Sequence, residues 1–363
     1  MGRPAKASID LNALRANYRL AQEVAPHSQS LAVVKANAYG HGAVACARAL
    51  ESLAPAFGVA CIEEALKLRA AGISKPILLL EGSFTADEVA IAARENFWLM
   101  VENEQHIEQI RASHPDHPVQ VWIKVDTGMH RLGMEPAQLP AVYETLKGLP
   151  QVMDEMVIAT HFSSADSLDD PTTRLQIKTF SRACEGLEAP RSLANSAGLM
   201  AWADARAQWN RPGFMLYGAS PFDRPQAVAD RLRPVMTLSS GVIGLRQVAA
   251  GEAVGYARSW VAQRPSTIAT VAIGYGDGYP RHAPSGTPVL VNGQRAPLVG
   301  RVSMDMITVD VTDLPPVSLN DPVVLWGAEL PVNEIAACAG TIGYELLTRM
   351  TGRVPLSYRG GDE

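Results

Sequence analysis

The sequence predicts an α/β fold in which a (β/α)8 TIM barrel is followed by a second, mostly β domain. In residues 8–232 short apolar runs alternate with amphipathic segments of helical period, whereas residues 233–363 show apolar alternation between closely spaced turn signals. The first pattern is typical of a parallel sheet covered by helices and the second of an antiparallel sheet. A doubly wound open sheet, the alternative architecture, is disfavoured because no GxGxxG motif follows the first apolar run.

The elements of the barrel are predicted in chain order from these patterns. A short strand at residues 7–10 leads into a helix that ends near Val24, and Asp10 is suited to cap this helix. Apolar runs then predict eight barrel strands at residues 31–35, 56–60, 77–80, 97–101, 119–125, 156–161, 191–195 and about 209–215. Amphipathic segments between the strands predict helices at residues 43–52, 63–71, 86–94, 102–113, 136–147 and 172–186.

The second domain is predicted to extend from residue 233 to residue 363, and residues 1–7 can pair with it. Asn292 and Gly293 stand between two apolar runs, which is a strong signal for a two-residue β-hairpin. A helical stretch is expected near residues 344–350. Because no low-complexity linker separates the two parts, we expect them to share a packed interface.

The composition is that of an ordinary globular protein, with 47% hydrophobic and 19% charged residues among 363. A net charge of -5 disfavours nucleic acid as a partner. The four cysteines show no CxxC or Cys/His spacing, so we expect neither disulfides nor a metal site. No apolar run has the length of a signal-peptide core or a membrane span, so we expect a cytoplasmic protein with no membrane partner.

Lys35 is the first candidate for chemistry because it ends a buried apolar strand, in the stretch LAVVKANAYGHG at residues 31–42. At such a position the ammonium is partly removed from water, which lowers its pKa and frees the amine as a nucleophile or a base. In a barrel of this kind the reactive groups lie at the carboxyl ends of the strands. We therefore expect Lys35 at the mouth of the barrel.

Residues that follow the last two barrel strands can hold a phosphate group, because this is the usual place for phosphate in such a barrel. Ser196 supplies a hydroxyl, and Gly213 lets the backbone approach, so that its amide and that of Phe214 can face an anion. Tyr39 and Tyr358 can add phenolic donors. A phosphate cradle opposite a reactive lysine describes a site for pyridoxal 5′-phosphate (PLP).

The stretch AVVKANAYGHG resembles the cofactor-lysine signature of the alanine racemases, which use PLP, and further matches extend from residue 8 to the last ten residues. The resemblance implies that Lys35 bonds the aldehyde of PLP and that Arg211 faces its pyridine nitrogen. An arginine does not readily give up a proton, so the ring is expected to be a weak electron sink. Transamination and decarboxylation are thereby suppressed.

Racemisation requires proton transfer on both faces of Cα, and therefore two groups on opposite sides of the cofactor. Lys35 serves one face. The resemblance assigns the other face to Tyr256, in VGYARSW, with His161 between Tyr256 and Arg211 easing the loss of the phenolic proton. In the family the β domain of one subunit covers the barrel mouth of the other, so we expect a homodimer with shared active sites.

The resemblance also implies the substrate contacts. Arg131 is expected to bind the substrate carboxylate and the phenolic oxygen of PLP, together with the backbone amide of Met304 in the loop that contains Asp305. Tyr275 belongs to a narrow corridor, and Lys124 matches a lysine that is often carbamylated and then orients Arg131. The crowding leaves room for about a methyl group, which favours L-alanine and D-alanine, with serine as a weaker substrate.

Two other functions stay open at this point. A PLP-dependent amino-acid decarboxylase shares the two-domain plan, but it is expected to place an acidic residue at the pyridine nitrogen, where this chain has Arg211. A non-catalytic PLP carrier would leave the β domain, with Tyr256 and Met304, unexplained. As a racemase the chain would either supply D-alanine for peptidoglycan or degrade D-alanine as a nutrient.

Overall fold

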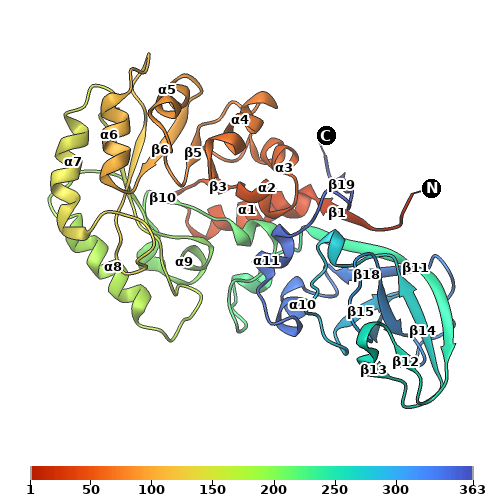
Figure 1. Ribbon diagram of the computed structural model, residues 1–363. Helices are drawn as coiled ribbons and strands as arrows, with labels where there is room; N and C mark the ends of the chain where they lie inside the picture. Colours follow the sequence, from red (N-terminus) through yellow and green to blue (C-terminus); the bar gives the residue numbers. More distant parts are fainter. Residues whose placement is uncertain (1, 362–363) are drawn as a thin grey trace.

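A computed structural model describes residues 2–361, and the first part of the chain forms a parallel β-barrel surrounded by helices (Figure 1). Its strands are β2 (Gln29–Ser30), β3 (Ala32–Val33), β4 (Phe57–Val59), β5 (Ile77–Leu79), β6 (Phe97–Val101), β7 (Val121–Lys124), β8 (Val157–Ala159), β9 (Arg191–Ser192) and β10 (Trp209–Asn210). They form a nine-stranded sheet in the order β2-β10-β9-β8-β7-β6-β5-β4-β3. The predicted TIM-type barrel is confirmed, and only β2 lies outside the predicted strand ranges.

The barrel is closed by the extended segment that carries β2 and β3. On one side, the amide of Leu31 donates to the carbonyl of Asn210 at 2.8 Å, beside the pairing of β2 with β10. On the other side, the amide of Ala32 donates to the carbonyl of Ala56 at 3.0 Å, beside the pairing of β3 with β4. Because both edges of this segment are bonded, the carboxyl ends of the parallel strands meet at one mouth.

Seven helices around the barrel agree with the predicted amphipathic segments, except at their ends. They are α1 (Leu11–Val24), α3 (Ala43–Leu50), α4 (Ile62–Ala70), α5 (Ala86–Arg94), α6 (Glu104–Ala112), α7 (Leu139–Lys147) and α8 (Thr172–Ala183), whereas the short α9 (Ser196–Ala201) was not predicted. Asp10 caps α1 as predicted, since its carboxylate accepts from the amides of Asn12 and Ala13. Asn103 caps α6, so this helix begins after Glu102 and not at it.

The second part of the chain is built around an eight-stranded sheet. Its elements are β11 (Met236–Val248), β12 (Ala253–Val254), β13 (Trp260–Val261), β14 (Ser266–Val271), β15 (Pro288–Val291), β16 (Gln294–Pro297), β17 (Ile307–Asp310), β18 (Pro322–Trp326), α10 (Val332–Cys338), α11 (Gly343–Thr348) and β19 (Leu356–Arg359). β12 and β13 form a separate two-stranded sheet. The second, mostly β domain is confirmed, whereas its boundary at residue 233 stays a prediction.

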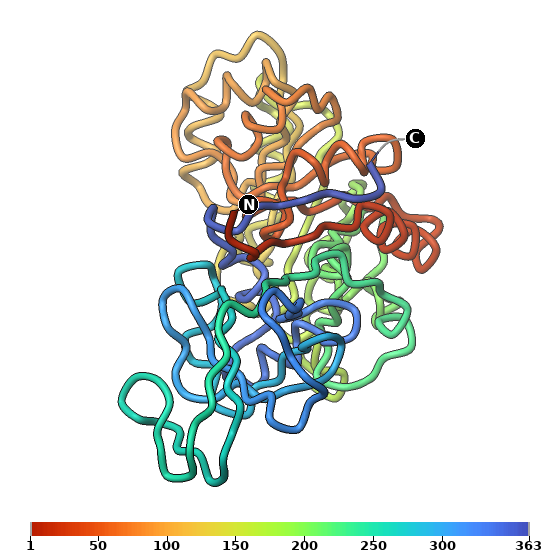
Figure 2. Tube along the Cα trace, turned by 90° about the vertical axis from the view of Figure 1, so that its right-hand side faces the viewer, coloured from red at the N-terminus to blue at the C-terminus, as the bar shows by residue number. Residues whose placement is uncertain are grey.

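The first strand of the chain belongs to this second sheet. β1 (Lys6–Asp10) pairs antiparallel with β11 and parallel with β19. Figure 2 shows the red N-terminal segment beside the blue C-terminal strand. The barrel is therefore inserted between strands of the β domain, and the chain crosses from one part to the other twice.

The predicted hairpin at Asn292 and Gly293 joins β15 to β16. Both residues have positive φ, 52° and 78°, as a type I′ turn requires. Asn tolerates this backbone region better than other residues with a side chain, and Gly adopts it without strain. The turn signal in the sequence therefore predicted both the position and the geometry of this connection.

Candidate active site

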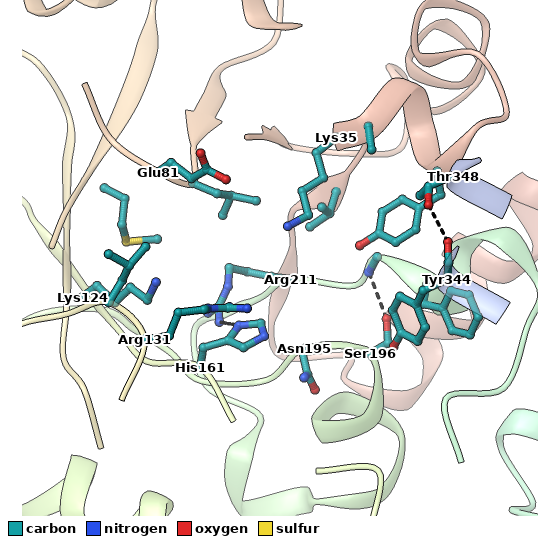
Figure 3. Close-up of a pocket in the computed structure, with 18 of the residues that line it drawn as sticks. Lys35, Glu81, Lys124, Arg131, His161, Asn195, Ser196, Arg211, Tyr344 and Thr348 are labelled. Carbon is teal, nitrogen blue, oxygen red and sulfur yellow. Dashed lines mark hydrogen bonds between the residues drawn. The ribbon is translucent and has the colours of Figure 1, made fainter. Parts of the chain in front are cut away.

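The carboxyl ends of the barrel strands surround a cavity of about 670 Å³ (Figure 3). Nine of the residues predicted for the site line it, namely Lys35, Tyr39, Lys124, Arg131, His161, Ser196, Arg211, Gly213 and Phe214. They lie at the ends of five different strands of the barrel or in the loops that follow them. The topology thus brings together polar residues that are far apart in the sequence, as expected for the mouth of a barrel.

Lys35 is followed by a turn of left-handed helix, labelled α2 (Lys35–Tyr39). The φ angles of Ala36, Asn37 and Ala38 are 51°, 55° and 54°, and that of Tyr39 is 50°. A left-handed backbone costs a residue with a side chain roughly 1–2 kcal/mol. Four such residues in succession persist only if neighbouring groups hold them in place.

Glu64 of α4 holds the start of this turn. Its carboxylate accepts from the amide of Ala36 at 2.7 Å and from the amide of Ala60, beyond the end of β4, at 2.9 Å. The carboxylate thus ties the residue after Lys35 to the neighbouring strand of the barrel. A charged acceptor forms stronger hydrogen bonds than a neutral one, which suits it to offset backbone strain.

Asn37 and His41 hold the rest of the turn. The side-chain oxygen of Asn37 accepts from the amide of Ala43 at 3.0 Å. His41 is fully buried, and its Nδ1 lies 3.0 Å and 2.8 Å from the carbonyl oxygens of Ala38 and Tyr39. Burial lowers the pKa of His41 to about 4, so the ring is neutral at pH 7 and Nδ1 carries the proton that it donates.

The amine of Lys35 points into the cavity (Figure 3). Burial lowers the pKa of Lys35, and the positive charges of Arg131 and Lys124 lower it further, while Glu81 and Glu64 oppose this effect. The neutral amine is therefore more populated at pH 7 than that of a surface lysine. This is the property that a nucleophilic lysine requires.

The opposite end of the cavity is built from the loops after β9 and β10. Ser196 Oγ accepts from the amide of Gly213 at 3.0 Å, which leaves the hydroxyl hydrogen to donate. The amide of Gly213 is thus not free to bind an anion as predicted, whereas Phe214 opens a 3₁₀ turn at a position where amides lack a partner within the helix. A Cβ at Gly213 would lie 2.6 Å from the phenol oxygen of Tyr39, so only glycine fits there.

Arg211 crosses the floor of the cavity between these two ends. Its Nη1 donates to the carbonyl and the hydroxyl of Ser192 at 2.9 and 2.6 Å, and its Nη2 donates to the carbonyl of Thr160 at 2.6 Å. Burial lowers the pKa of Arg211 to about 10, so the guanidinium stays charged at pH 7. Across residues 2–361 its Nε has no hydrogen-bond partner, which leaves this donor to the cavity.

His161 lies against Arg211, with Nδ1 at 3.4 Å from Nη2. Burial lowers the pKa of His161 well below its usual value, and the charge of Arg211 lowers it further. The imidazole is therefore neutral at pH 7. Because Nδ1 faces a donor, the ring proton belongs on Nε2, which can donate to a further group.

Comparisons with known proteins agree with this geometry. The family model described as "Alanine racemase, N-terminal domain" matches residues 9–221, and the model described as "Alanine racemase, C-terminal domain" matches residues 235–358. The chain belongs to the alanine racemase family. It is 51% identical to an alanine racemase of Chromohalobacter salexigens over 100% of both chains, and 51% identical to a catabolic alanine racemase of Pseudomonas putida over 99% of both.

Solved structures of the family have the same fold. The biosynthetic alanine racemase of Pseudomonas aeruginosa superposes with a TM-score of 0.96 at 49% identity, covering 99% of this chain and 100% of that one. The alanine racemase of Bartonella henselae superposes with a TM-score of 0.89 at 33% identity, covering 99% of this chain and 100% of that one, and its structure contains covalently bound pyridoxal phosphate.

Tyr344 is a cavity residue that the sequence did not reveal. It lies on α11, and its ring stacks on that of Phe214 with centroids 3.6 Å apart and lies 6.2 Å from that of Tyr39. Tyr358 was predicted as a phenolic donor, but it is 43% exposed and its oxygen lies against Gly42. It does not belong to the described residues that line the cavity. The prediction is corrected, because β19 pairs with β1 in the second sheet and not at the barrel mouth.

Four predicted residues lie in the β domain, away from the cavity of their own chain. Tyr256 is 67% exposed and Met304 is 52% exposed, while Tyr275 and Asp305 are also at the surface. Tyr256 lies between β12 and β13, at the end of the β domain that is remote from the barrel (Figure 1). The described part of the chain that lines the cavity includes none of the four.

The loop that contains Met304 is anchored by Asp277, whose side chain is fully buried. The carboxylate of Asp277 pairs with Arg3 and lies 3.4 Å from Nε of Arg353. The same two arginines bind Asp305, since Arg3 donates to its carbonyl at 2.7 Å and Arg353 to its carboxylate at 2.6 Å. This cluster ties the N-terminal segment to the loop.

Replacing Asp277 by asparagine should lower the free energy of unfolding by about 3 kcal/mol, because it leaves two arginines beside a buried position without their counter-charge. Chemical denaturation of the purified protein measures this change. Asp313→Asn, at an exposed pair with Arg264, is the matched control and should change the free energy of unfolding by less than about 1 kcal/mol. Equal losses in the two variants would contradict the role of Asp277.

The described residues contain no helix that is both long and apolar enough to cross a membrane. Nor do residues 2–361 contain a group of three or more His, Cys, Asp or Glu residues that can hold a metal ion.

The family is PLP-dependent, and the donors of the cavity fit this cofactor. The amine of Lys35 suits an aldehyde, the hydroxyl of Ser196 and the amide of Phe214 suit a phosphate, and Nε of Arg211 suits a ring nitrogen. The close approach of Tyr39 to Gly213 explains why the phosphate end of the cavity requires a glycine. The cavity is also cationic, as an anionic cofactor requires.

Replacing Glu64 by alanine should raise the dissociation constant of PLP about tenfold or more. The reason is that the amide of Ala36 loses a charged partner worth roughly 1.5–3 kcal/mol, so the strained turn no longer fixes Lys35. Fluorescence titration of the apoprotein with PLP measures the constant. Glu63→Ala, at an exposed neighbour on the same helix, is the control. An unchanged constant in the Glu64 variant would show that other contacts suffice.

Proposed function

We propose that this chain interconverts L-alanine and D-alanine with PLP, as a homodimer whose active sites each combine residues of both subunits. The observation that carries the proposal is the cavity, where an amine of lowered pKa faces a phosphate cradle with a buried guanidinium between them. Membership of the alanine racemase family supports the same reaction.

Five groups would hold the cofactor. Lys35 would bond its aldehyde, Ser196 and the amide of Phe214 would bind its phosphate, and Tyr344 would add a phenolic donor that the sequence did not suggest. Arg211 would donate from Nε to the ring nitrogen without transferring a proton. Bound PLP withdraws electrons from the Cα of an attached amino acid and so makes its hydrogen acidic.

Proton transfer at Cα would use two bases. The amine of Lys35, released when the substrate amine takes its place, would serve one face. The partner subunit's Tyr256 would serve the other. Its exposure in the single chain and its distance from the barrel in Figure 1 support a role in another subunit's cavity. Burial of an exposed tyrosine ring by a second chain is energetically favourable, because the ring has a large apolar area.

The pair of Arg211 and His161 would ease the loss of the phenolic proton. Arg211 donates toward Nδ1 of His161, so Nε2 of the imidazole presents a donor. A donor that faces the phenol oxygen stabilises the phenolate more than the phenol, which lowers the pKa of the tyrosine. Because the positive charge stays on the buried guanidinium, the imidazole need not be charged for this effect.

Arg131 lines the cavity and would bind the carboxylate of the substrate. The partner's Met304 would add a backbone amide, and the partner's Tyr275 would narrow the corridor that leads to the site. Tyr344 and Ile342 already line the mouth in the single chain. These large side chains support a substrate no larger than alanine at Cβ, with serine as a weaker one.

The decarboxylase alternative is not favoured, because decarboxylation benefits from a protonated ring nitrogen and Arg211 does not supply that proton. Incubation of the purified protein with L-alanine in deuterium oxide separates the functions. Deuterium at Cα together with loss of optical rotation is expected for racemisation. Release of carbon dioxide would indicate a decarboxylase, and no change of the amino acid would indicate a PLP carrier.

Both the location in the cytoplasm and the physiological direction of the reaction stay predictions. The named relatives include a catabolic and a biosynthetic alanine racemase, at 51% and 49% identity. The two sequence identities are nearly equal, so they favour neither role.

A further inference from the structure

A buried ion pair lies on the floor of the cavity, on neighbouring strands of the barrel. Glu102 directly follows β6 and Lys124 ends β7, and these strands pair in register. Nζ of Lys124 lies 2.5 Å from Oε1 of Glu102, and their side chains are 11% and 1% exposed. Such burial makes the pair sensitive to any change of charge on either group.

This pair sits within the cationic side of the cavity. Figure 3 shows Lys124 far from Ser196, with Arg131 between Lys124 and His161. Burial raises the pKa of Glu102, whereas the charges of Lys124 and Arg131 oppose this effect. The ion pair with Lys124 therefore offsets part of the cost of burying this carboxylate.

We propose that Glu102 is a positioning residue of the active site, which holds Lys124 as an ammonium and thereby prevents its carbamylation. The effect of this pair on Lys35 rests on the proposed function, whereas the carbamylation of Lys124 does not depend on it. This assignment decides against the carbamate on Lys124 that the resemblance left as one possibility. In this chain the negative charge beside Lys124 comes from a second side chain and not from a modification.

The reason lies in the proton and charge balance of the modification. A carbamate forms when the ammonium first loses a proton and the neutral amine then adds carbon dioxide and releases a second proton, so that one positive charge becomes one negative charge overall. The Nζ of Lys124 is engaged in a charge-assisted hydrogen bond to Glu102, and addition of carbon dioxide to this nitrogen would break that ion pair. A carbamate on Lys124 would also place a second anion at hydrogen-bond distance from a buried carboxylate, where like charges strongly disfavour each other.

The consequence concerns Lys35. The ammonium of Lys124 is one of the charges that lower the pKa of Lys35. A carbamate at the same place would act in the opposite direction and would favour protonated Lys35. The pair of Glu102 and Lys124 therefore preserves the free amine that the proposed reaction requires.

The test is ¹³C NMR of the holoenzyme equilibrated with ¹³C-bicarbonate, compared with the Lys124→Met variant. Subtraction of the two spectra removes the carbamates of surface amines. We expect the wild-type spectrum to contain no carbamate signal that is missing from the spectrum of the Lys124→Met variant. Such a carbon in wild type would overturn the proposal.

Glu102→Gln tests the role of the carboxylate itself, and Glu81→Gln is the matched control, since Glu81 lines the cavity without pairing with Lys124. We expect a carbamate carbon that depends on Lys124 in the Glu102 variant and none in the control. Its absence from the Glu102 variant would overturn the role of Glu102. If Glu102→Gln does not fold, Glu102→Met replaces it. Racemisation is not part of this readout, so failure here is distinct from failure of the proposed function.

Discussion

Replacing Lys35 by alanine is expected to abolish racemisation and the covalent attachment of PLP. The variant lacks both the amine that bonds the aldehyde and the base for one face of Cα, and the loss of an acid–base group alone costs up to about 10⁴-fold in rate. The backbone around residue 35 should persist, because Glu64 holds the turn through the amide of Ala36 and not through the lysine side chain.

Two measurements check this expectation. Absorbance of the protein incubated with PLP reports the covalent link, and deuterium incorporation from deuterium oxide reports proton transfer at Cα. Lys67→Ala, at an exposed position on α4, is the matched control and should keep both properties. Proton exchange at the wild-type rate in the Lys35 variant, with PLP bound, would exclude Lys35 as a base.

Replacing Tyr256 by phenylalanine should slow proton abstraction from L-alanine by about 10²- to 10³-fold, since it removes only the acid–base oxygen from one face. Abstraction from D-alanine, which would then use Lys35 on the other face, should be reduced far less. The asymmetry follows from two bases on opposite sides of one carbon. Washout of the Cα hydrogen into deuterium oxide, started from each enantiomer separately, measures the two rates.

The control for this variant is Tyr143→Phe, because Tyr143 makes only a 3.4 Å hydrogen bond and lies on α7 on the outside of the barrel. Sedimentation or size-exclusion experiments should show the same assembly for both variants. Equal losses from the two enantiomers in the Tyr256 variant, with the assembly intact, would contradict separate bases.

The fold was predictable because the different local patterns in the sequence all indicated the same architecture. Apolar runs, amphipathic helices and the Asn292-Gly293 turn each indicated the element that the structure has. Lys35 and Ser196 were predictable for a related reason, because a strand end in a barrel points toward the mouth wherever the strand lies. Arg211 was named only by the resemblance to the family, since its position along the chain did not distinguish it from a surface arginine.

Other parts of the site depend on tertiary contacts that local patterns do not encode. Tyr344 and Tyr358 both lie near the C-terminal end of the sequence, and only the packing of α11 against the barrel decides which phenol reaches the cavity. Glu102 was included in a predicted helix, although the Asn103 cap leaves it at a strand end. A carboxylate directly after an apolar run was the signal that could have identified it.

The left-handed turn after Lys35 is a further example. The glycines of the stretch indicated a turn, but the positive φ angles fall on Ala36 to Tyr39, which rarely adopt them. Their conformation is imposed by Glu64 from another helix and by the buried ring of His41. The backbone preferences of these residues are thus overridden at the place where the chemistry requires Lys35 to be held in position.

The pairing of β1 with β11 and β19 bears on how the molecule is made. A ribosome synthesises β1 first and β19 last, and the contact between Ser8 and Ser357 closes a loop of 349 residues. The barrel can fold before β1 has both of its partner strands, so the β domain is completed only after β19 has been synthesised. Until Arg353 has been synthesised, the loop of Met304 lacks one of the two arginines that bind Asp277 and Asp305.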